Sequence, residues 1–190
     1  MRLIIVRHGR TERTDKGIVE GQLDGGLSKV GREETEELAK RLRYLKIDVM
    51  YVSDLQRSVE TAEIIARYHD GVDMELRDRL RERDYGAHQG RHWSMAWSAD
   101  TRIENRTAPG GETFEELRNR VKGFIDEIRA LHLNDTVLVV THRCPIVAIL
   151  SLLLNIDSEK AARMVPPYSG IITLEVGEVG ARVVENPKGF

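Results

Sequence analysis

Short apolar runs that alternate with amphipathic helical segments constrain the fold of this 190-residue chain most. The runs near 2–6 and 136–140 are continuously apolar, as strands buried on both faces are. The segment after Ser28 and the segment 113–131 carry apolar residues at helical spacing instead. Further strands are expected near 47–52, 72–76, 171–176 and 182–185. Such alternation predicts a three-layer α/β/α sandwich with a mostly parallel central sheet.

The chain is expected to form one domain over residues 1–190, because this length suits a single hydrophobic core. Residues 77–111 are irregular and rich in arginine, and Pro109-Gly110-Gly111 ends the stretch. We expect this segment to be a small cap or lid inserted in the domain. Trp93 and Trp97 lie one helical turn apart within it, and they either line the substrate or pack the cap down.

Composition disfavours several classes of protein. A net charge of −2 leaves no basic surplus for binding a nucleic-acid backbone. The longest apolar runs are too short for a membrane span or a signal peptide core, so no membrane partner is expected. Cys144 is the single cysteine and can form no internal disulfide, which favours the cytoplasm. A homodimer is compatible with the sequence, which leaves the oligomeric state open.

Two of the expected strands run directly into a histidine. Strand 2–6 leads to Arg7 and His8, and strand 136–140 leads to Thr141 and His142. The carboxyl ends of parallel strands meet at one edge of a sheet, where ligands bind. An arginine fork matches the oxygens of a phosphate, and Arg7 and Arg57 are the candidates. The pattern therefore predicts a site for a phosphate monoester.

A neutral imidazole is a competent nucleophile toward phosphorus when nearby cations keep it deprotonated. His8 is the candidate for this role. The leaving oxygen needs a proton, and Glu82 in a predicted loop is the candidate donor.

The sequence resembles the histidine phosphatase superfamily, in its phosphoglycerate mutase-like branch, over roughly residues 2–155. Six segments carry the resemblance, and they occur in the family's order. They are Arg7-His8-Gly9 with Thr11, the loop and helix start from Gly21 to Gly31, Ser53–Ala62, Leu80-Arg81-Glu82 with Gly86 and Gly90, Pro109–Thr113, and Val139–His142.

This resemblance implies a role for each matching residue. His8 would attack phosphorus and become phosphohistidine. Arg7, Arg57 and His142 would hold the non-bridging oxygens. Glu82 would protonate the leaving oxygen and then activate water. The family implies no metal and no other cofactor.

Several positions depart from the family's pattern. Thr14 stands where an asparagine usually helps to hold phosphate, so Thr14 is expected among the phosphate-binding residues. Arg143 replaces the glycine usual after the second histidine, and Gln89 replaces a frequent glutamate. Arg10 and Arg143 either add charge at the mouth of the site, which would favour a substrate with a second anionic group, or point to solvent.

We expect a phosphatase that hydrolyses a small phosphorylated metabolite. The alternatives are a phosphoglycerate mutase and a non-catalytic phosphate-binding regulatory module. Mutases of this branch are longer and carry added segments that close over the intermediate, whereas the expected cap here is short. All five core residues of the family are present, which disfavours a non-catalytic module.

Two other chemistries are weakly supported. His88 and His92 have the spacing of a metal pair, but no further ligand has convincing spacing. A cysteine phosphatase would need an arginine six residues after Cys144, where the chain has Leu150. We therefore expect Cys144 to be a small buried apolar residue.

Overall fold

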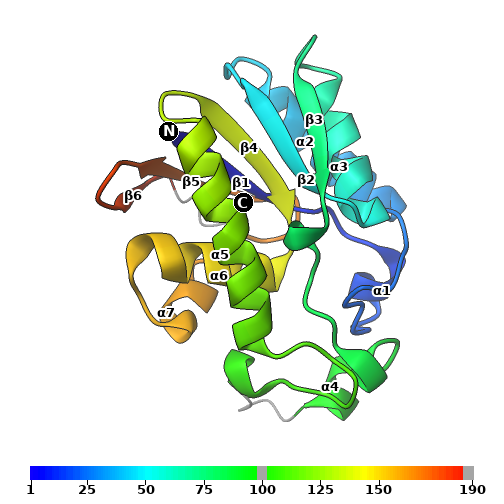
Figure 1. Ribbon diagram of the computed structural model, residues 1–190. Coiled ribbons are helices and arrows are strands. Elements are labelled where there is room, and N and C mark those ends of the chain that lie inside the picture. The colour runs from blue at the N-terminus through cyan, green and yellow to red at the C-terminus, as the bar shows by residue number, and fades with distance from the viewer. Residues whose placement is uncertain (98–101, 186–190) are drawn as a thin grey trace.

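A six-stranded sheet forms the centre of the computed structural model, which describes residues 1–97 and 102–185 (Figure 1). The strand order is β3-β2-β4-β1-β5-β6, and the strands from β3 to β1 are parallel whereas β5 and β6 are antiparallel to their neighbours. The strands are β1 (Arg2–Arg7), β2 (Val49–Ser53), β3 (Asp73–Arg77), β4 (Thr136–Thr141), β5 (Ile171–Val176) and β6 (Ala181–Glu185).

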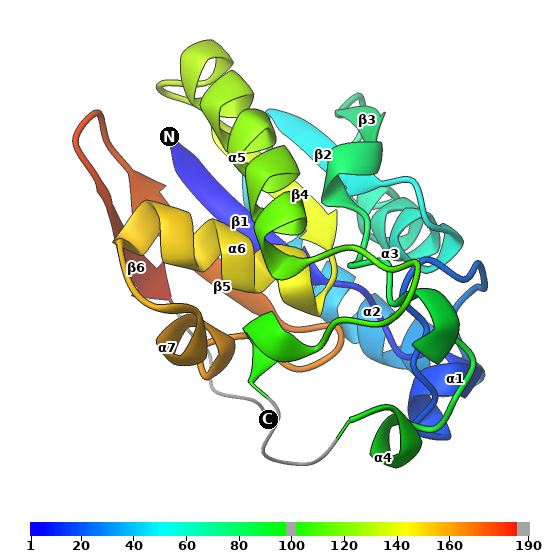
Figure 2. The ribbon, with the colours of Figure 1, turned by 60° about the horizontal axis from the view of Figure 1, so that its bottom comes forward.

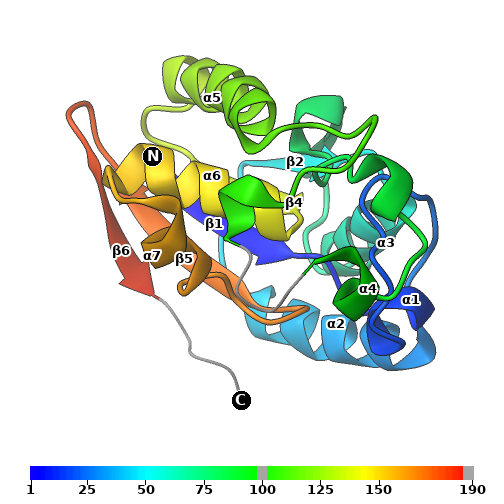
Figure 3. The same ribbon diagram turned by 90° about the horizontal axis from the view of Figure 1, so that it is seen from below.

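Helices cover both faces of this sheet, as the view along the layers shows (Figure 3). The helices α2 (Lys29–Leu42) and α3 (Gln56–Ala66) lie on one face. The other face carries α5 (Phe114–Leu131), α6 (Arg143–Leu154) and α7 (Ser158–Ala162). The predicted three-layer sandwich with a mostly parallel sheet is confirmed.

Alternate residues of each central strand serve separate cores. In β1, Leu3 and Ile5 pack toward α5 and α6, whereas Ile4 and Val6 pack toward α2 and α3. All four side chains are fully buried, which explains why this strand is continuously apolar rather than alternating. Burial on both faces fixes the strand rigidly and hence the position of the residues that follow it.

Two long helices begin as their sequences predict. Ser28 accepts a hydrogen bond from the Gly31 amide at the start of α2. Thr113 and Glu116 form a reciprocal capping box at the start of α5. Both caps satisfy amides that would otherwise lack a partner in the first helical turn.

Ser53 and Asp54 are residue types that commonly cap a helix, which predicts that one of them caps α3, but neither does. The residue that caps α3 is Leu55, which makes no side-chain hydrogen bond to the helix. Asp54 forms an ion pair with Arg81 instead, and the Ser53 hydroxyl contacts His142 at 2.8 Å. These two polar side chains therefore connect α3 to other parts of the chain rather than to its own first turn.

The connection from β3 to α5 contains α4 (Trp93–Ala96) and three short 3₁₀ segments, Asp78–Leu80, Gly86–His88 and Ile103–Asn105. It lies against the loop that follows β1, which carries α1 (Glu12–Asp15) (Figure 2). Backbone hydrogen bonds from Val19 to Arg91 and from Trp93 to Gly17 join the two segments. Between residues 1 and 97 and between 102 and 185, no helix is long and apolar enough to cross a membrane.

The fold predicts opposite effects of alanine at two helical glycines. In Gly31→Ala the new Cβ would overlap the backbone carbonyl oxygen of Arg10, which cannot move aside easily. We expect a loss of about 1–3 kcal/mol in the free energy of unfolding, as in other overpacked sites. Gly123→Ala is the matched control, because its Cβ meets only Arg79 Nη1 at 3.6 Å. It should stabilise α5 by up to about 1 kcal/mol.

Urea unfolding of the two variants beside the wild type measures both effects. A Gly31→Ala variant as stable as the wild type would show that the backbone of Arg10 does not pack closely against α2 at Gly31.

Candidate active site

His8 lies immediately beyond the end of β1 and is almost fully buried. Its Nδ1 lies 2.8 Å from the carbonyl oxygen of Gly9. A carbonyl oxygen can only accept, so Nδ1 carries the proton and donates it. In the neutral imidazole Nε2 is then unprotonated, and its lone pair is available for attack on an electrophile.

The surroundings of His8 keep its imidazole neutral. Burial lowers the pKa of His8 well below 6.5, and the positive charges of Arg57 and Arg7 lower it further. Only the hydrogen bond to Gly9 opposes this shift of the pKa. The ring is therefore held in its nucleophilic form at neutral pH.

His142 stands beside His8 because β1 and β4 are parallel and in register. Arg7 pairs with Thr141, and the His8 amide donates to the Thr141 carbonyl oxygen at 2.9 Å. The two imidazole centroids are 4.8 Å apart. Burial, followed by the charge of Arg57, also lowers the pKa of His142 well below 6.5. The predicted meeting of two strand-end histidines at one sheet edge is what the structure contains.

Two serine hydroxyls orient the ring of His142. Its Nε2 lies 2.8 Å from Ser53 Oγ and 3.2 Å from Ser58 Oγ. Its Nδ1 is buried and has no hydrogen-bond partner. When a serine hydroxyl donates to Nε2, the proton of His142 resides on Nδ1 and is available to an acceptor in the site.

Arg57 is 1% exposed and comes from the first turn of α3. Its two terminal nitrogens donate to the carbonyl oxygens of Leu23 and Gly21, at 2.9 and 2.6 Å. Glu20 is also buried and lies 3.8 Å from Arg57 Nε, too far for a hydrogen bond. The loop after β1 thus fixes the guanidinium, while its Nε keeps an unused proton.

Arg7 is held by an aromatic ring rather than by a carboxylate. Its Cζ lies 3.7 Å from the ring centroid of Tyr168, and Nη1 donates to the carbonyl oxygen of Pro166 at 3.3 Å. A cation against an aromatic face is attracted by about 0.5–2 kcal/mol, more when water is excluded. Tyr168 also contacts His8, with ring centroids 5.4 Å apart.

Three buried nitrogens in this cluster have no hydrogen-bond partner, namely Arg7 Nε, Arg57 Nε and His142 Nδ1. Leaving a buried donor unpaired costs about 1–3 kcal/mol, and more for a charged group. Two fixed guanidinium groups with spare donors, beside a neutral histidine, are the kind of donors that an anion with several oxygens requires.

Glu82 approaches the same site from the β3–α5 connection, and its side chain is almost fully buried. Its Oε1 accepts from the amides of Arg83 and Cys144, at 2.7 and 3.2 Å. Its Oε2 has only a weaker contact with the Cys144 amide, at 3.4 Å. Cys144 follows His142 by two residues, so the start of α6 places the carboxyl beside the second histidine.

The other residues predicted to bind phosphate or to lie at the mouth of the site are Thr14, Arg143 and Arg10, and each has different contacts. The Thr14 hydroxyl donates to the Thr11 carbonyl oxygen and accepts from the Thr11 amide, so its one proton is already used. Arg143 opens α6 and is half-buried, and its charge acts on Arg7. Arg10 is bound to Asp15 at 2.6 Å.

The two tryptophans differ. Trp97 packs against the main core and stacks edge-on against Tyr85, with centroids 4.8 Å apart. Trp93 is half-exposed and lies next to His92. Trp97 therefore packs the β3–α5 connection against the main core, whereas Trp93 does not.

Sequence reasoning missed four residues that orient the cluster: Glu20, Ser53, Ser58 and Tyr168. No helical spacing indicates Ser58, which lies one residue after Arg57 and five after Ser53. No sequence signal indicates Tyr168, because the loop before β5 reaches Arg7 only through the antiparallel pairing of β5 with β1.

Among the residues that the structure describes, no group of three or more His, Cys, Asp or Glu side chains is arranged to hold a metal ion. His92 Nδ1 contacts the Ser94 hydroxyl, and His88 stacks against Trp97. Cys144 is fully buried, and burial raises the pKa of its thiol from 9.0. A thiol in that state is a poor nucleophile.

Comparison with known proteins places this arrangement in a family. Residues 3–186 match the histidine phosphatase superfamily, branch 1. Phosphoserine phosphatase 1 of Hydrogenobacter thermophilus is 34% identical over 84% of this chain and 79% of its own. The metal-independent phosphoserine phosphatase of Arabidopsis thaliana is 32% identical over 74% of this chain and 63% of its own. A phosphoglycerate mutase structure from Bacillus anthracis shares the fold, with a TM-score of 0.86 and 23% identity over 96% of this chain and 91% of that one.

The lowered histidine pKa values predict how stability depends on pH. Both values lie well below 6.5 in the folded protein, whereas an unfolded histidine titrates near 6.5. As the pH falls through 6.5, the unfolded chain takes up protons that the folded protein does not. The free energy of unfolding should therefore fall, by about 1 kcal/mol per histidine at about pH 5.5.

Urea unfolding at about pH 7.5 and about pH 5.5 measures this loss, and His8→Gln should show a smaller loss than the wild type, by about 1 kcal/mol. Resonances of His8 and His142 that titrate near pH 6.5 in NMR spectra would contradict the described burial.

Proposed function

Because this chain belongs to the histidine phosphatase superfamily, we propose that it hydrolyses a small phosphomonoester through a phosphohistidine on His8. The observation that supports this proposal best is the set of three unpaired buried nitrogens around a neutral imidazole. A phosphoryl group offers three non-bridging oxygens, one for each of these donors.

In the first step Nε2 of His8 attacks phosphorus and the bond from phosphorus to the leaving oxygen breaks. Arg7, Arg57 and His142 bind the non-bridging oxygens and stabilise the charge that spreads over them. Arg7 and Arg57 can do so without reorganising, because Tyr168 and the carbonyl groups of Gly21 and Leu23 already fix their positions.

Glu82 supplies the proton that the leaving oxygen needs. Its Oε2 is the freer of the two oxygens, so we assign the transferable proton to it. In the second step the resulting carboxylate takes a proton from water, which attacks the phosphohistidine and releases inorganic phosphate. The Thr14 hydroxyl already donates within α1, so this proposal assigns it no contact with phosphate.

The substrate that we propose is a small phosphorylated metabolite, with phosphoserine as the first compound to assay. Two relatives more than 30% identical carry the name phosphoserine phosphatase, and one of those names includes metal-independent. We accordingly propose catalysis without a metal ion. The single cysteine favours a cytoplasmic location.

Residues 77–111, of which 98–101 lie outside the described residues, are proposed to act as the cap of this one-domain chain. Arg83, fully buried, donates to the carbonyl oxygens of Ile103 and Glu112 at 2.8 Å each, and so ties the end of the segment to its start. Backbone hydrogen bonds to the loop after β1 hold its middle part. We propose that water reaches the phosphohistidine beside this segment, which favours hydrolysis over transfer to a retained hydroxyl.

The intermediate provides the direct test of this function. Brief reaction with phosphoserine or phenyl phosphate, followed by denaturation, should leave an acid-labile and base-stable phosphoryl group on His8, located by mass spectrometry. His8→Ala should carry no label and should lose activity by about 10³-fold or more. His92→Ala, which changes an exposed histidine, should label as the wild type does. A phosphoryl group on Cys144 or on a serine would contradict the mechanism.

The role of Glu82 predicts a dependence on the leaving group. Glu82→Gln cannot supply the proton, so hydrolysis of an alkyl phosphate such as phosphoserine should slow by about 10²–10⁴-fold. Hydrolysis of p-nitrophenyl phosphate should slow much less during phosphorylation of His8, because nitrophenolate leaves without a proton. Single-turnover rates measure this step for both substrates.

Glu115→Gln, an exposed carboxylate in the first turn of α5, is the matched control and should behave as the wild type. Equal slowing of both substrates by Glu82→Gln would show that the carboxyl orders the site rather than transferring a proton.

A further inference from the structure

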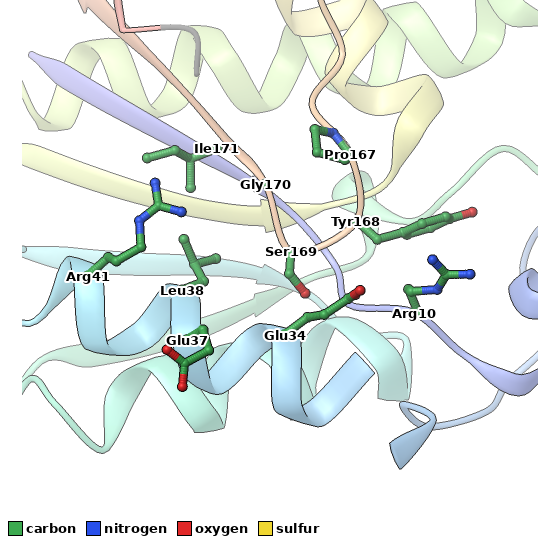
Figure 4. Close-up of a pocket in the computed structure, with 10 residues that line it drawn as sticks. All are labelled: Arg10, Glu34, Glu37, Leu38, Arg41, Pro167, Tyr168, Ser169, Gly170 and Ile171. Atoms are coloured by element: carbon green, nitrogen blue, oxygen red, sulfur yellow. The ribbon is translucent and has the colours of Figure 1, made fainter. Parts of the chain in front are cut away.

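A cavity lies between α2 and the loop that precedes β5, and Tyr168 is among the residues that line it (Figure 4). Its volume is 540 Å³, within the range of pockets that bind small molecules. Neither His8 nor His142 lines it. Tyr168 and Arg10 do, so the cavity adjoins the candidate active site without containing its reacting atoms.

The inner wall of this cavity is apolar and is held rigidly. Leu38 and Ile171 are core residues, and both line the cavity beside Tyr168. The loop that carries Tyr168 is fastened to β1, because the Ser169 amide donates to the Arg7 carbonyl oxygen at 3.1 Å. The Ser169 hydroxyl also contacts Thr35 of α2 at 2.9 Å. A ligand bound here would meet a surface that these contacts already hold in place.

One carboxylate in the cavity is free to bind a ligand. Glu34 of α2 points between Ser169 and Arg10 in Figure 4. Its side chain makes no hydrogen bond or ion pair with any residue in 1–97 or 102–185, although its charge acts on Arg10. Arg10 is already bound to Asp15 at 2.6 Å, and Glu37 is bound to Lys40. Arg41 also lines the cavity. The lining therefore offers a carboxylate that accepts no hydrogen bond within the described residues, next to an apolar floor.

We propose that this cavity binds an aromatic or similarly flat apolar group that carries an ammonium or another N–H donor. The apolar part packs on Tyr168, Leu38 and Ile171, and the donor binds the carboxylate of Glu34. Tyr168 lines the cavity and also contacts Arg7, so a ligand that packs on Tyr168 would be coupled to the arginine of the proposed phosphate site.

Two sources of such a ligand share this chemistry. In the first, the ligand is the leaving group of the substrate, and the inference then rests on the proposed function. In the second, the ligand is a separate effector molecule. A binding measurement with a small molecule tests whether the cavity is a binding site. The effect of the leaving group on the rate of hydrolysis then distinguishes the two sources.

Tyramine, a phenol ring with an ethylammonium, is the first probe, and 3-(4-hydroxyphenyl)propionate is its matched anion. Isothermal titration calorimetry of the full chain should give a dissociation constant on the order of 1 mM or lower for tyramine, as its roughly ten non-hydrogen atoms allow. The anion should bind at least about fivefold more weakly. Glu34→Gln, which keeps the shape but removes the charge, should weaken tyramine binding by at least about fivefold.

Glu33→Gln is the control variant. Glu33 is the next residue of α2, is exposed and lies within 3.9 Å of Lys29, outside the cavity, so its loss should leave tyramine binding unchanged. Equal binding of tyramine by Glu34→Gln and the wild type, or no binding by the wild type, would overturn the inference. Neither outcome would contradict the proposed function, because hydrolysis of phenyl phosphate through His8 is measured separately.

Comparison of O-phosphotyramine with phenyl phosphate identifies the source. If Glu34→Gln lowers kcat/KM for O-phosphotyramine alone, the cavity receives the leaving group. If kcat/KM is unchanged for both while tyramine still binds in saturating inorganic phosphate, the cavity receives a separate effector. Both results support the cavity as a binding site.

Discussion

The parallel pairing of β1 with β4 is the constraint on which the candidate site depends. The register that pairs Arg7 with Thr141 places His8 and His142 one residue beyond the ends of two adjacent strands. The hydrogen bond from the His8 amide to the Thr141 carbonyl oxygen extends this pairing to the histidines themselves. Each face of these two strands packs into a different core. A shift of one residue in their pairing would turn each apolar side chain toward the opposite core and would separate the two imidazoles.

Around this pair, the protein holds two guanidinium groups in place mainly through neutral groups, with the Glu20 carboxylate 3.8 Å from Arg57 Nε. Arg57 is fixed by two carbonyl oxygens, and Arg7 by one carbonyl oxygen and the ring of Tyr168. These contacts orient the guanidinium groups and leave one N–H donor of each unpaired, which the proposed binding of a phosphoryl group would use. Burial, together with these same charges, lowers the pKa of His8, so the two arginines serve both proposed roles, anion binding and the nucleophilicity of His8.

The β3–α5 connection brings the remaining chemistry to this edge. It carries Glu82, whose carboxyl is anchored to the start of α6 by the Cys144 amide. Its later part packs through Trp97 on Tyr85, and Tyr85 in turn contacts the Cys144 sulfur at 2.9 Å. Glu82 is thus placed by contacts from both its own segment and α6, although nothing in its local sequence requires a buried position.

The sequence alone determined the layers of the fold and the two strand-end histidines, whereas the resemblance to the family selected Arg57 and Glu82 as candidates. Hydrophobic periodicity carries that information, because burial on one or two faces is a local property of each element. Local pattern failed at Ser53 and Asp54, which have the residue types of a helix cap but bind His142 and Arg81. Only the tertiary structure decided such partners, and it decided the placement of Tyr168 and Glu20 beside the two arginines. These contacts join residues far apart in the chain, and they depend on strand order and register, which no local periodicity specifies.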